Sequence, residues 1–169
     1  MSEIKFNGTP ITISGNIPSV GDKAEDFSFV KEDLSEGSLA DYDSKVKVIM
    51  AVPSLDTGIC QKEARAFNEQ LSNREGVVGL IVSKDLPFAM KRFCASEGLE
   101  NVVSASDFRY NDFTSQYNLE MTSGPLKGLM ARVVFVLDKD NTIVYKEEVD
   151  DITHEPNYDN AKQAVDQLV

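Results

Sequence analysis

Hydrophobic and polar positions along the chain predict strands and helices that alternate. Nearly unbroken apolar runs at 46–52 and 77–83 are typical of strands covered on both faces of a sheet. Helical spacing follows the first run, and a strand at 102–105 is followed by another helical pattern. This order is the signature of a largely parallel sheet between helices. The apolar positions of the two helical patterns are Ile59, Ala64, Phe67 and Leu71, and then Phe108, Phe113 and Tyr117.

A short helix is expected directly after the second apolar run. Asp85 is placed to cap its first turn, Pro87 fits that turn, and Gly98 is suited to end it. Cys94 then lies near the end of this helix. The segment 121–130 contains two glycines and a proline and is expected to be a loop. Its GPLKGL stretch matches neither of the common glycine-rich phosphate-binding patterns, which argues against a nucleotide site.

The N-terminal part of the chain predicts an extension of this sheet-and-helix core. Asn7 and Gly8 lie between alternating apolar residues, which predicts a β-hairpin within about residues 1–15. A short strand follows at 27–31, and the polar stretch at 32–45 is expected only to connect it to the first apolar run.

The C-terminal part predicts two strands and a helix. The two strands lie within 132–149 and are joined by a polar turn at 138–141, and so short a turn requires them to be antiparallel. Arg132 stands just before the first of these strands. The spacing of Tyr158, Ala161, Val165 and Leu168 predicts a terminal amphipathic helix.

Composition narrows the class of protein. At 169 residues with 41% hydrophobic content, the chain fits one domain, 1–169, with a sizeable core. The net charge of −11, from 28 acidic and 17 basic residues, argues against nucleic acid and against an anionic membrane surface as partners. No segment resembles a signal peptide or reaches the length of a membrane span, so we expect a cytoplasmic protein.

The candidate chemistry lies in two cysteines. Cys60 and Cys94 are 34 positions apart, which is neither a C-x-x-C motif nor a zinc-ligand spacing. The single histidine, His154, leaves a zinc or iron site short of ligands and weakens any hydrolase that needs a histidine base. His154 is therefore interpreted as a solvated or capping residue near the chain end.

Cys60 is expected in the first turn of the helix that follows the first apolar run. Unpaired N–H groups and the positive end of the helix dipole favour a reactive thiolate there. Thr57, three residues earlier, can turn its hydroxyl back toward the sulfur. From position alone, however, a cysteine in apolar surroundings is more often a small buried hydrophobic residue.

Three stretches carry a resemblance to a known family. Pro53, Thr57 and Cys60 form P-x-x-x-T-x-x-C, which resembles the peroxidatic motif of peroxiredoxins. PSLDTGIC, which contains that motif, together with RFCASEGLEN at 92–101 and GPLKGLMAR at 124–132, resembles the thiol peroxidase subfamily of atypical 2-Cys type. The resemblance covers essentially the whole chain.

This resemblance implies a fold and a set of site residues. The fold is α/β and thioredoxin-like, with a mixed, largely parallel central sheet flanked by helices and an N-terminal β-hairpin extension. Cys60 is the peroxidatic cysteine, which reduces hydrogen peroxide or an organic hydroperoxide and becomes a sulfenic acid. Arg132 supplies the active-site guanidinium, Thr57 a hydroxyl, and Pro53 shields the thiolate from water. Cys94 resolves the sulfenic acid as an intrasubunit disulfide.

The resemblance also implies partners. Thioredoxin or a similar dithiol protein reduces the disulfide, and family members are commonly homodimers. No metal, flavin or nicotinamide cofactor is required, because the two thiols hold both electrons.

The residues alone also allow other functions. A peroxide-responsive redox sensor could use the same cysteine pair without turnover, and a thioredoxin-like binding module could keep the fold without the chemistry. Taken alone, Cys94 is a buried core cysteine and Arg132 a surface ion-pair residue.

Overall fold

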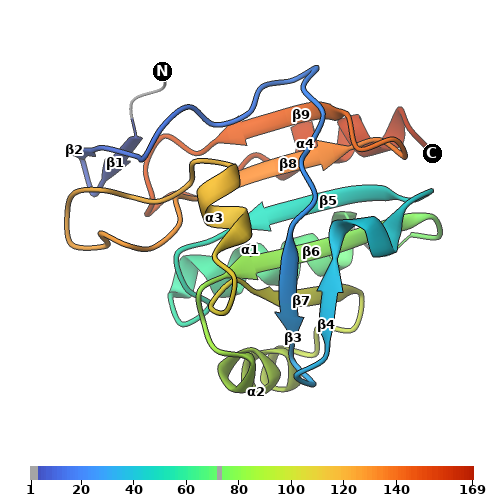
Figure 1. Ribbon diagram of the computed structural model, residues 1–169, viewed down its shortest axis with the longest axis horizontal. Helices are drawn as coiled ribbons and strands as arrows, with labels where there is room; N and C mark the ends of the chain where they lie inside the picture. The colour runs from blue at the N-terminus through green and yellow to red at the C-terminus, as the bar shows by residue number, and fades with distance from the viewer. Residues whose placement is uncertain (1–3, 72–73) are drawn as a thin grey trace.

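A seven-stranded mixed sheet forms the centre of the computed structural model, which describes residues 4–71 and 74–169 (Figure 1). In sheet order its strands are β4 (Glu36–Ser38), β3 (Ser28–Lys31), β7 (Val102–Ser106), β6 (Val77–Ser83), β5 (Val46–Ala51), β8 (Val133–Leu137) and β9 (Ile143–Glu148). The expected α/β fold class with a mixed central sheet is confirmed.

Parallel pairing is limited to the middle of this sheet. β6 pairs in parallel with β5 and with β7, whereas the other neighbouring pairs are antiparallel. The expectation of a largely parallel sheet is therefore correct only for β5, β6 and β7, which helical crossovers join. β3 and β4, and likewise β8 and β9, follow each other through short turns, which can join only antiparallel strands.

The predicted N-terminal hairpin is present. β1 (Ile4–Phe6) pairs antiparallel with β2 (Thr9–Ile11), and Asn7 and Gly8 form the turn with positive φ angles of 49° and 87°. The carboxylate of Asp151 accepts hydrogen bonds from the N–H groups of both turn residues, at 3.0 and 2.9 Å. Residues 1–3 of the predicted segment lie outside the described residues.

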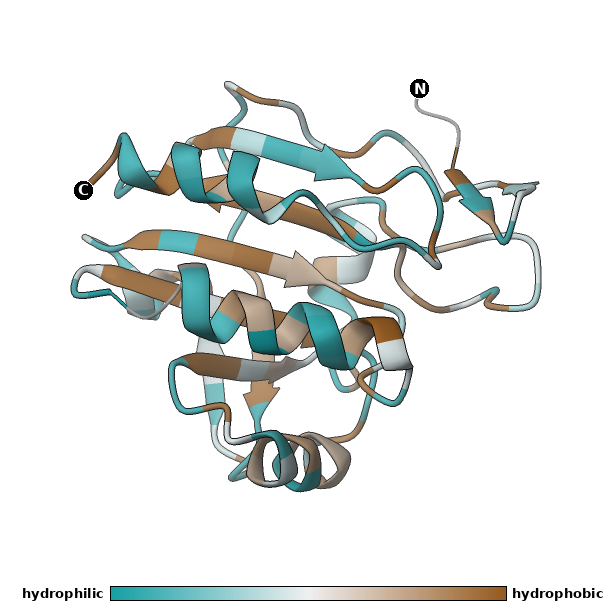
Figure 2. Cartoon of the chain, turned by 180° about the vertical axis from the view of Figure 1, so that it is seen from behind, coloured by the Kyte–Doolittle hydropathy of each residue, from teal (hydrophilic) through white to brown (hydrophobic). Residues whose placement is uncertain are grey.

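Helices cover both faces of the sheet. Side chains of β5 point alternately to two apolar cores, with Val48 and Met50 on one face and Ile49 and Ala51 on the other. The helices of the described residues are α1 (Gly58–Ala66), which a π-helical turn at Phe67–Leu71 continues, α2 (Pro87–Glu97), α3 (Asp112–Gln116) and α4 (Tyr158–Asp166). Figure 2 looks onto the first of these faces, which α1, α2 and α4 cover, and α3 lies on the other face.

The polar stretch at 32–45 contains more structure than the sequence indicated. It forms β4 and a short 3-10 helix at Leu39–Tyr42. Gly37 in β4 is buried against the ring of Phe29, since a Cβ at this position would lie 2.8 Å from that ring. This packing is specific to one pair of residues, so a hydropathy pattern does not reveal it.

No helix in the described part of the chain is long and apolar enough to cross a membrane.

Candidate active site

The central strand β5 ends at a turn that delivers Cys60 to the start of α1. Pro53, which is buried, follows the end of the strand, and Thr57 is the N-cap of the helix. The Thr57 hydroxyl accepts a hydrogen bond from the Cys60 N–H at 3.2 Å and donates to the Ser54 carbonyl at 3.4 Å. The hydroxyl therefore fixes the backbone of Cys60, whereas the sequence suggested a contact with its sulfur.

The Cys60 side chain is fully buried beside a guanidinium. Nη1 of Arg132 donates a hydrogen bond to Cys60 Sγ at 3.1 Å, and Nε donates to the Ile152 carbonyl at 3.0 Å. Arg132 reaches this position because Val133 of β8 pairs with Ala51 at the end of β5. A guanidinium held in this way stabilises negative charge on the sulfur.

Glu63 completes this cluster and was not identified from the sequence. Its Oε1 accepts from Arg132 Nη1 at 2.5 Å, and its side chain is fully buried. Burial raises the pKa of Glu63 to about 7, although the adjacent Arg132 acts to lower it. One signal was available, because Glu63 lies three residues after Cys60, on the face of the same helix that also buries Ala64 and Phe67.

Asp85 has a different role from the one predicted. The N-cap of α2 is Leu86, and no side chain caps that position. The Asp85 carboxylate instead accepts hydrogen bonds from the Ser54 hydroxyl at 2.8 Å and from the Leu55 N–H at 2.7 Å. Because β5 and β6 are parallel neighbours, the turns that follow them are adjacent, and Asp85 ties the Cys60 turn to the end of β6.

Cys94 lies near the end of α2, as predicted. Its side chain is 8% exposed, and its Sγ lies 2.9 Å from the Ser104 hydroxyl. Burial raises the pKa of the Cys94 thiol to about 11, and the negative charge of Glu32 adds to this shift. Cys60 and Cys94 are both free thiols, and they belong to the same apolar core on one face of the sheet.

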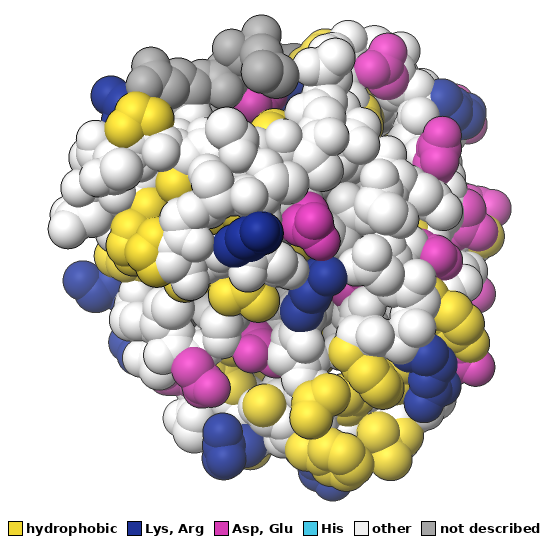
Figure 3. Space-filling model, turned by 60° about the vertical axis from the view of Figure 1, so that its left-hand side comes forward, with side chains coloured by type: hydrophobic (Ala, Val, Ile, Leu, Met, Phe, Trp, Pro, Cys, Tyr) yellow, Lys and Arg dark blue, Asp and Glu magenta, His cyan; other side chains and the backbone are white. Residues whose placement is uncertain are grey.

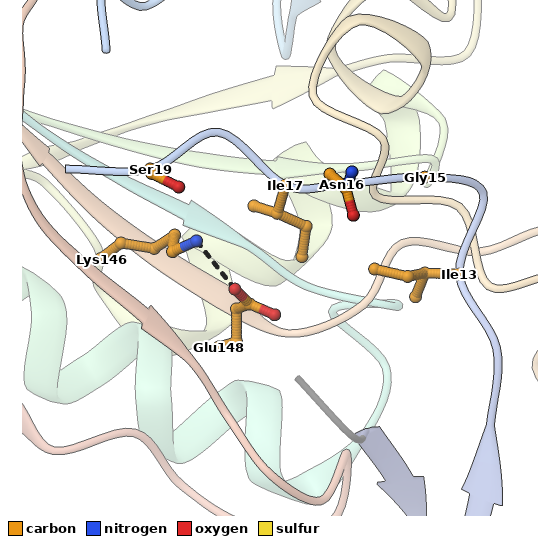
Figure 4. Close-up of a pocket in the computed structure, with 7 residues that line it drawn as sticks. All are labelled: Ile13, Gly15, Asn16, Ile17, Ser19, Lys146 and Glu148. Atoms are coloured by element: carbon orange, nitrogen blue, oxygen red, sulfur yellow. Dashed lines mark ion pairs between the residues drawn. The ribbon is translucent and has the colours of Figure 1, made fainter. Parts of the chain in front are cut away.

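Two further features lie apart from this cluster. His154 is largely exposed and faces Asp150 at 3.2 Å, in agreement with its interpretation as a solvated residue. A hollow of about 440 Å³ lies between residues 13–19 and β9, where Lys146 and Glu148 point toward one another and pair at 2.8 Å (Figure 4). The paired charges largely neutralise each other, so the hollow carries no net charge from β9.

The arrangement around Cys60 is suited to thiolate chemistry. The sulfur lies at a helix N-terminus, with the guanidinium of Arg132 beside it. These groups also favour the charge that spreads onto a substrate when the sulfur attacks it. Because Cys60 is 0% exposed, a substrate reaches the sulfur only when residues around it move.

Comparisons with known proteins show which family the chain resembles. Residues 19–162 match the Redoxin family. A thiol peroxidase of Leptospira interrogans is 52% identical over 160 residues, which are 94% of this chain and 94% of that protein. A thiol peroxidase of Streptococcus pneumoniae is 48% identical over 165 residues, which are 98% of this chain and 99% of that protein.

Solved structures share the fold. A peroxiredoxin-like protein from Aquifex aeolicus superposes with a TM-score of 0.94 at 42% identity, over 100% of this chain and 98% of that one. A thiol peroxidase from Chromobacterium violaceum superposes with a TM-score of 0.89 at 20% identity, over 98% and 96% of the two chains.

Proposed function

The chain belongs to the thiol peroxidases of the Redoxin family, and from this premise we propose that Cys60 is the residue at which it reduces peroxides. The protein is an enzyme that reduces peroxides at the expense of thiols. The observation that carries the assignment to Cys60 is the 3.1 Å hydrogen bond that it receives from Arg132 at the start of α1.

In the first step the Cys60 thiolate attacks one peroxide oxygen in line with the O–O bond. Cys60 becomes a sulfenic acid, the O–O bond breaks, and the leaving oxygen takes up a proton to give water or an alcohol. Arg132 and the N–H groups of the first turn of α1 stabilise the charge that moves onto the oxygens. Thr57 holds the Cys60 backbone, and Pro53 directs the turn that shields the sulfur.

In the second step Cys94 resolves the sulfenic acid. Its thiol condenses with Cys60–SOH, which forms the Cys60–Cys94 disulfide and releases water. Two observations support this pairing: Cys94 is the other cysteine of the chain, and its side chain belongs to the same core as that of Cys60. The two thiols are free and contact different partners, Arg132 and Ser104, so at least one of them must move before they bond.

A dithiol protein of the thioredoxin type then reduces the disulfide and restores both thiols. A cycle that alternates between thiols and disulfide fits a reducing compartment such as the cytoplasm. We assign this cycle to the chain as one domain, 1–169, with the β1–β2 hairpin as an extension of the thioredoxin-like core.

We further propose a homodimer. Hydrophobic side chains gather at the lower end of the face in Figure 3, the end at which α2 lies in Figure 1. Leu86 at the N-cap of α2, Phe88 in α2, and Phe108 and Tyr110 in the loop before α3 are exposed, with Phe88 69% accessible. Exposed aromatic residues at the start of α2 suit contact with a second copy. Sedimentation velocity tests this: wild type should be a dimer and Phe88→Asp a monomer. A monomeric wild type would contradict the proposal.

Peroxide consumption tests the proposed chemistry. Wild type, Cys60→Ser and Cys94→Ser are assayed with thioredoxin, thioredoxin reductase and NADPH, against hydrogen peroxide and an alkyl hydroperoxide. Wild type should turn over, Cys60→Ser should be inactive, and Cys94→Ser should consume about one equivalent and then stop. A Cys60→Ser variant with wild-type activity would overturn the assignment. A wild type that reacts once and is not recycled would instead indicate a redox sensor.

A further inference from the structure

Glu63 shares one nitrogen of Arg132 with Cys60. Nη1 donates at 2.5 Å to Glu63 Oε1 and at 3.1 Å to Cys60 Sγ. All three side chains are at most 1% exposed. In so little solvent, one positive charge lies between two groups that can both be negative, and ionisation of one weakens the support that the guanidinium gives to the other.

The second oxygen of the Glu63 carboxyl has no hydrogen-bond partner among the described residues. A buried carboxylate is costly unless both of its oxygens are paired, whereas a protonated carboxyl needs fewer partners. The geometry is therefore better suited to a carboxyl that carries a proton than to an ionised one.

Charged and titratable groups face Glu63 from each element packed around it. Cys60 lies on its own helix, Arg132 precedes β8, Glu147 belongs to β9, and Glu155 and Tyr158 lie before and in α4. Burial is the largest cause of the raised pKa of Glu63, and repulsion from Glu147 and Glu155 raises it further against the attraction of Arg132. The Glu63 carboxyl therefore gains and loses its proton near neutral pH.

We propose that Glu63 is a positioning residue whose proton sets how strongly Arg132 acts on Cys60. With the proton present, the guanidinium serves the Cys60 thiolate and the peroxide alone, while the carboxyl still accepts the hydrogen bond that orients Nη1. With the proton lost, the same charge is divided between two anions, and the first step slows. This inference rests on the proposed role of Cys60.

The test is the pH profile of the first step. The rate of hydrogen peroxide reduction in a single turnover, divided by the thiolate fraction from ultraviolet absorbance, is measured from pH 5.5 to 9 for wild type and Glu63→Gln. Glutamine keeps the size of the side chain and its accepting oxygen but cannot ionise. We expect the two rates to agree within about twofold at pH 6 and the variant to be at least about threefold faster at pH 8.5.

Glu69→Gln is the matched control. It removes a carboxylate from an exposed position of the π-helical turn that continues α1, and its rate should follow wild type at every pH. A constant ratio of Glu63→Gln to wild type across the pH range would show that Glu63 is only structural. A variant that becomes slower at high pH would show that the anion itself is needed.

A measurement on wild type keeps the inference testable if Glu63→Gln does not fold. Infrared spectra of protein labelled with ¹³C-glutamate should show a protonated carboxyl band at pH 6 that disappears by pH 8.5, and the absence of this band at pH 6 would overturn the inference. Failure of the proposed function can be told apart from failure of this inference. If Cys60 does not reduce peroxide, wild type itself shows no single-turnover rate to compare with the variant.

Discussion

The carboxylate of Asp85 accepts a hydrogen bond from the Leu55 N–H at 2.7 Å, although 30 positions separate the two residues. Asp85 follows β6, and Leu55 lies in the turn that presents Cys60. The Ser54 and Ser83 hydroxyls donate to the same carboxylate at 2.8 and 2.7 Å, so one side chain holds Leu55, Ser54 and Ser83 together. The position of Cys60, which follows β5, therefore depends on the neighbouring strand β6.

Asp85→Ala should impair both folding and catalysis. It leaves the Leu55 N–H and the hydroxyls of Ser54 and Ser83 without their acceptor, at a cost of about 1–3 kcal/mol in the free energy of unfolding. Displacement of the Cys60 turn should slow the first step about tenfold or more. Urea unfolding and single-turnover kinetics measure the two effects. Asp56→Ala, at an exposed position of the same turn, is the control, and equal rates for the two variants would contradict the role of Asp85.

Arg132→Ala should slow peroxide reduction about a hundredfold or more, because it removes a fixed donor from the transition state. Arg132→Lys keeps the charge but not the planar group that binds Cys60 and the Ile152 carbonyl together, so it should recover only part of the rate. Second-order rate constants with hydrogen peroxide, compared at equal folded fraction by circular dichroism, provide the measurement. A loss of less than about threefold in a folded Arg132→Ala protein would assign Arg132 to structure alone.

Glu63 should make the folded state less stable as the pH rises toward neutrality. Its pKa is about 7 in the folded protein against an ordinary value of 4.5, so the folded state retains a proton that the unfolded state releases between these values. This contribution to stability is fully present below pH 4.5 and is lost as the pH rises through 7, by on the order of 3 kcal/mol. Urea unfolding at pH 5 and pH 8 should show a larger fall for wild type than for Glu63→Gln. An equal fall in the free energy of unfolding for the two proteins would show that this pH dependence does not arise from Glu63.

Local patterns predicted most of the fold. Strands β5 and β6 are buried on both faces, so their apolar runs needed no knowledge of their neighbours. The Asn7-Gly8 turn requires positive φ angles that these two residue types adopt readily, and the hairpin followed from them. β4 was missed because it depends on the packing of Gly37 against Phe29, a contact that no periodicity encodes.

In the candidate site, too, local contacts could be predicted from local sequence patterns, whereas contacts between distant residues could not. Thr57 and Cys60 are three residues apart, so the helix start was enough to predict that they lie close together, although the hydroxyl contacts the Cys60 N–H rather than the sulfur. The contact between Arg132 and Cys60 spans 72 positions and was expected only from the family resemblance. Asp85 was given a local role as a helix cap, and Glu63 was missed, because the partners of both are set by the pairing of β5 with β6 and with β8.

The capping of α2 should govern how fast the disulfide forms. In the proposed cycle Cys94 leaves Ser104 to reach Cys60, and we expect α2 to open locally when it does so. The N-cap residue of α2, Leu86, is exposed and offers no side-chain hydrogen bond, so the start of the helix is weakly held. Leu86→Ser should add a cap of about 1 kcal/mol, which corresponds to about fivefold slower opening.

Single-turnover experiments with one equivalent of hydrogen peroxide separate the two steps. Disulfide formation should be about fivefold slower in Leu86→Ser than in Leu86→Ala, which removes the same apolar side chain without adding a cap. The first step should be equal in both variants, because α2 contributes no group to the Cys60, Arg132 and Glu63 cluster. More sulfenic acid should therefore accumulate in Leu86→Ser, and excess peroxide should overoxidise it sooner. Mass spectrometry of acid-quenched samples measures the sulfenic acid and disulfide fractions. If both variants form the disulfide at one rate, opening of the first turn of α2 does not limit resolution, and Cys94 reaches Cys60 by another movement.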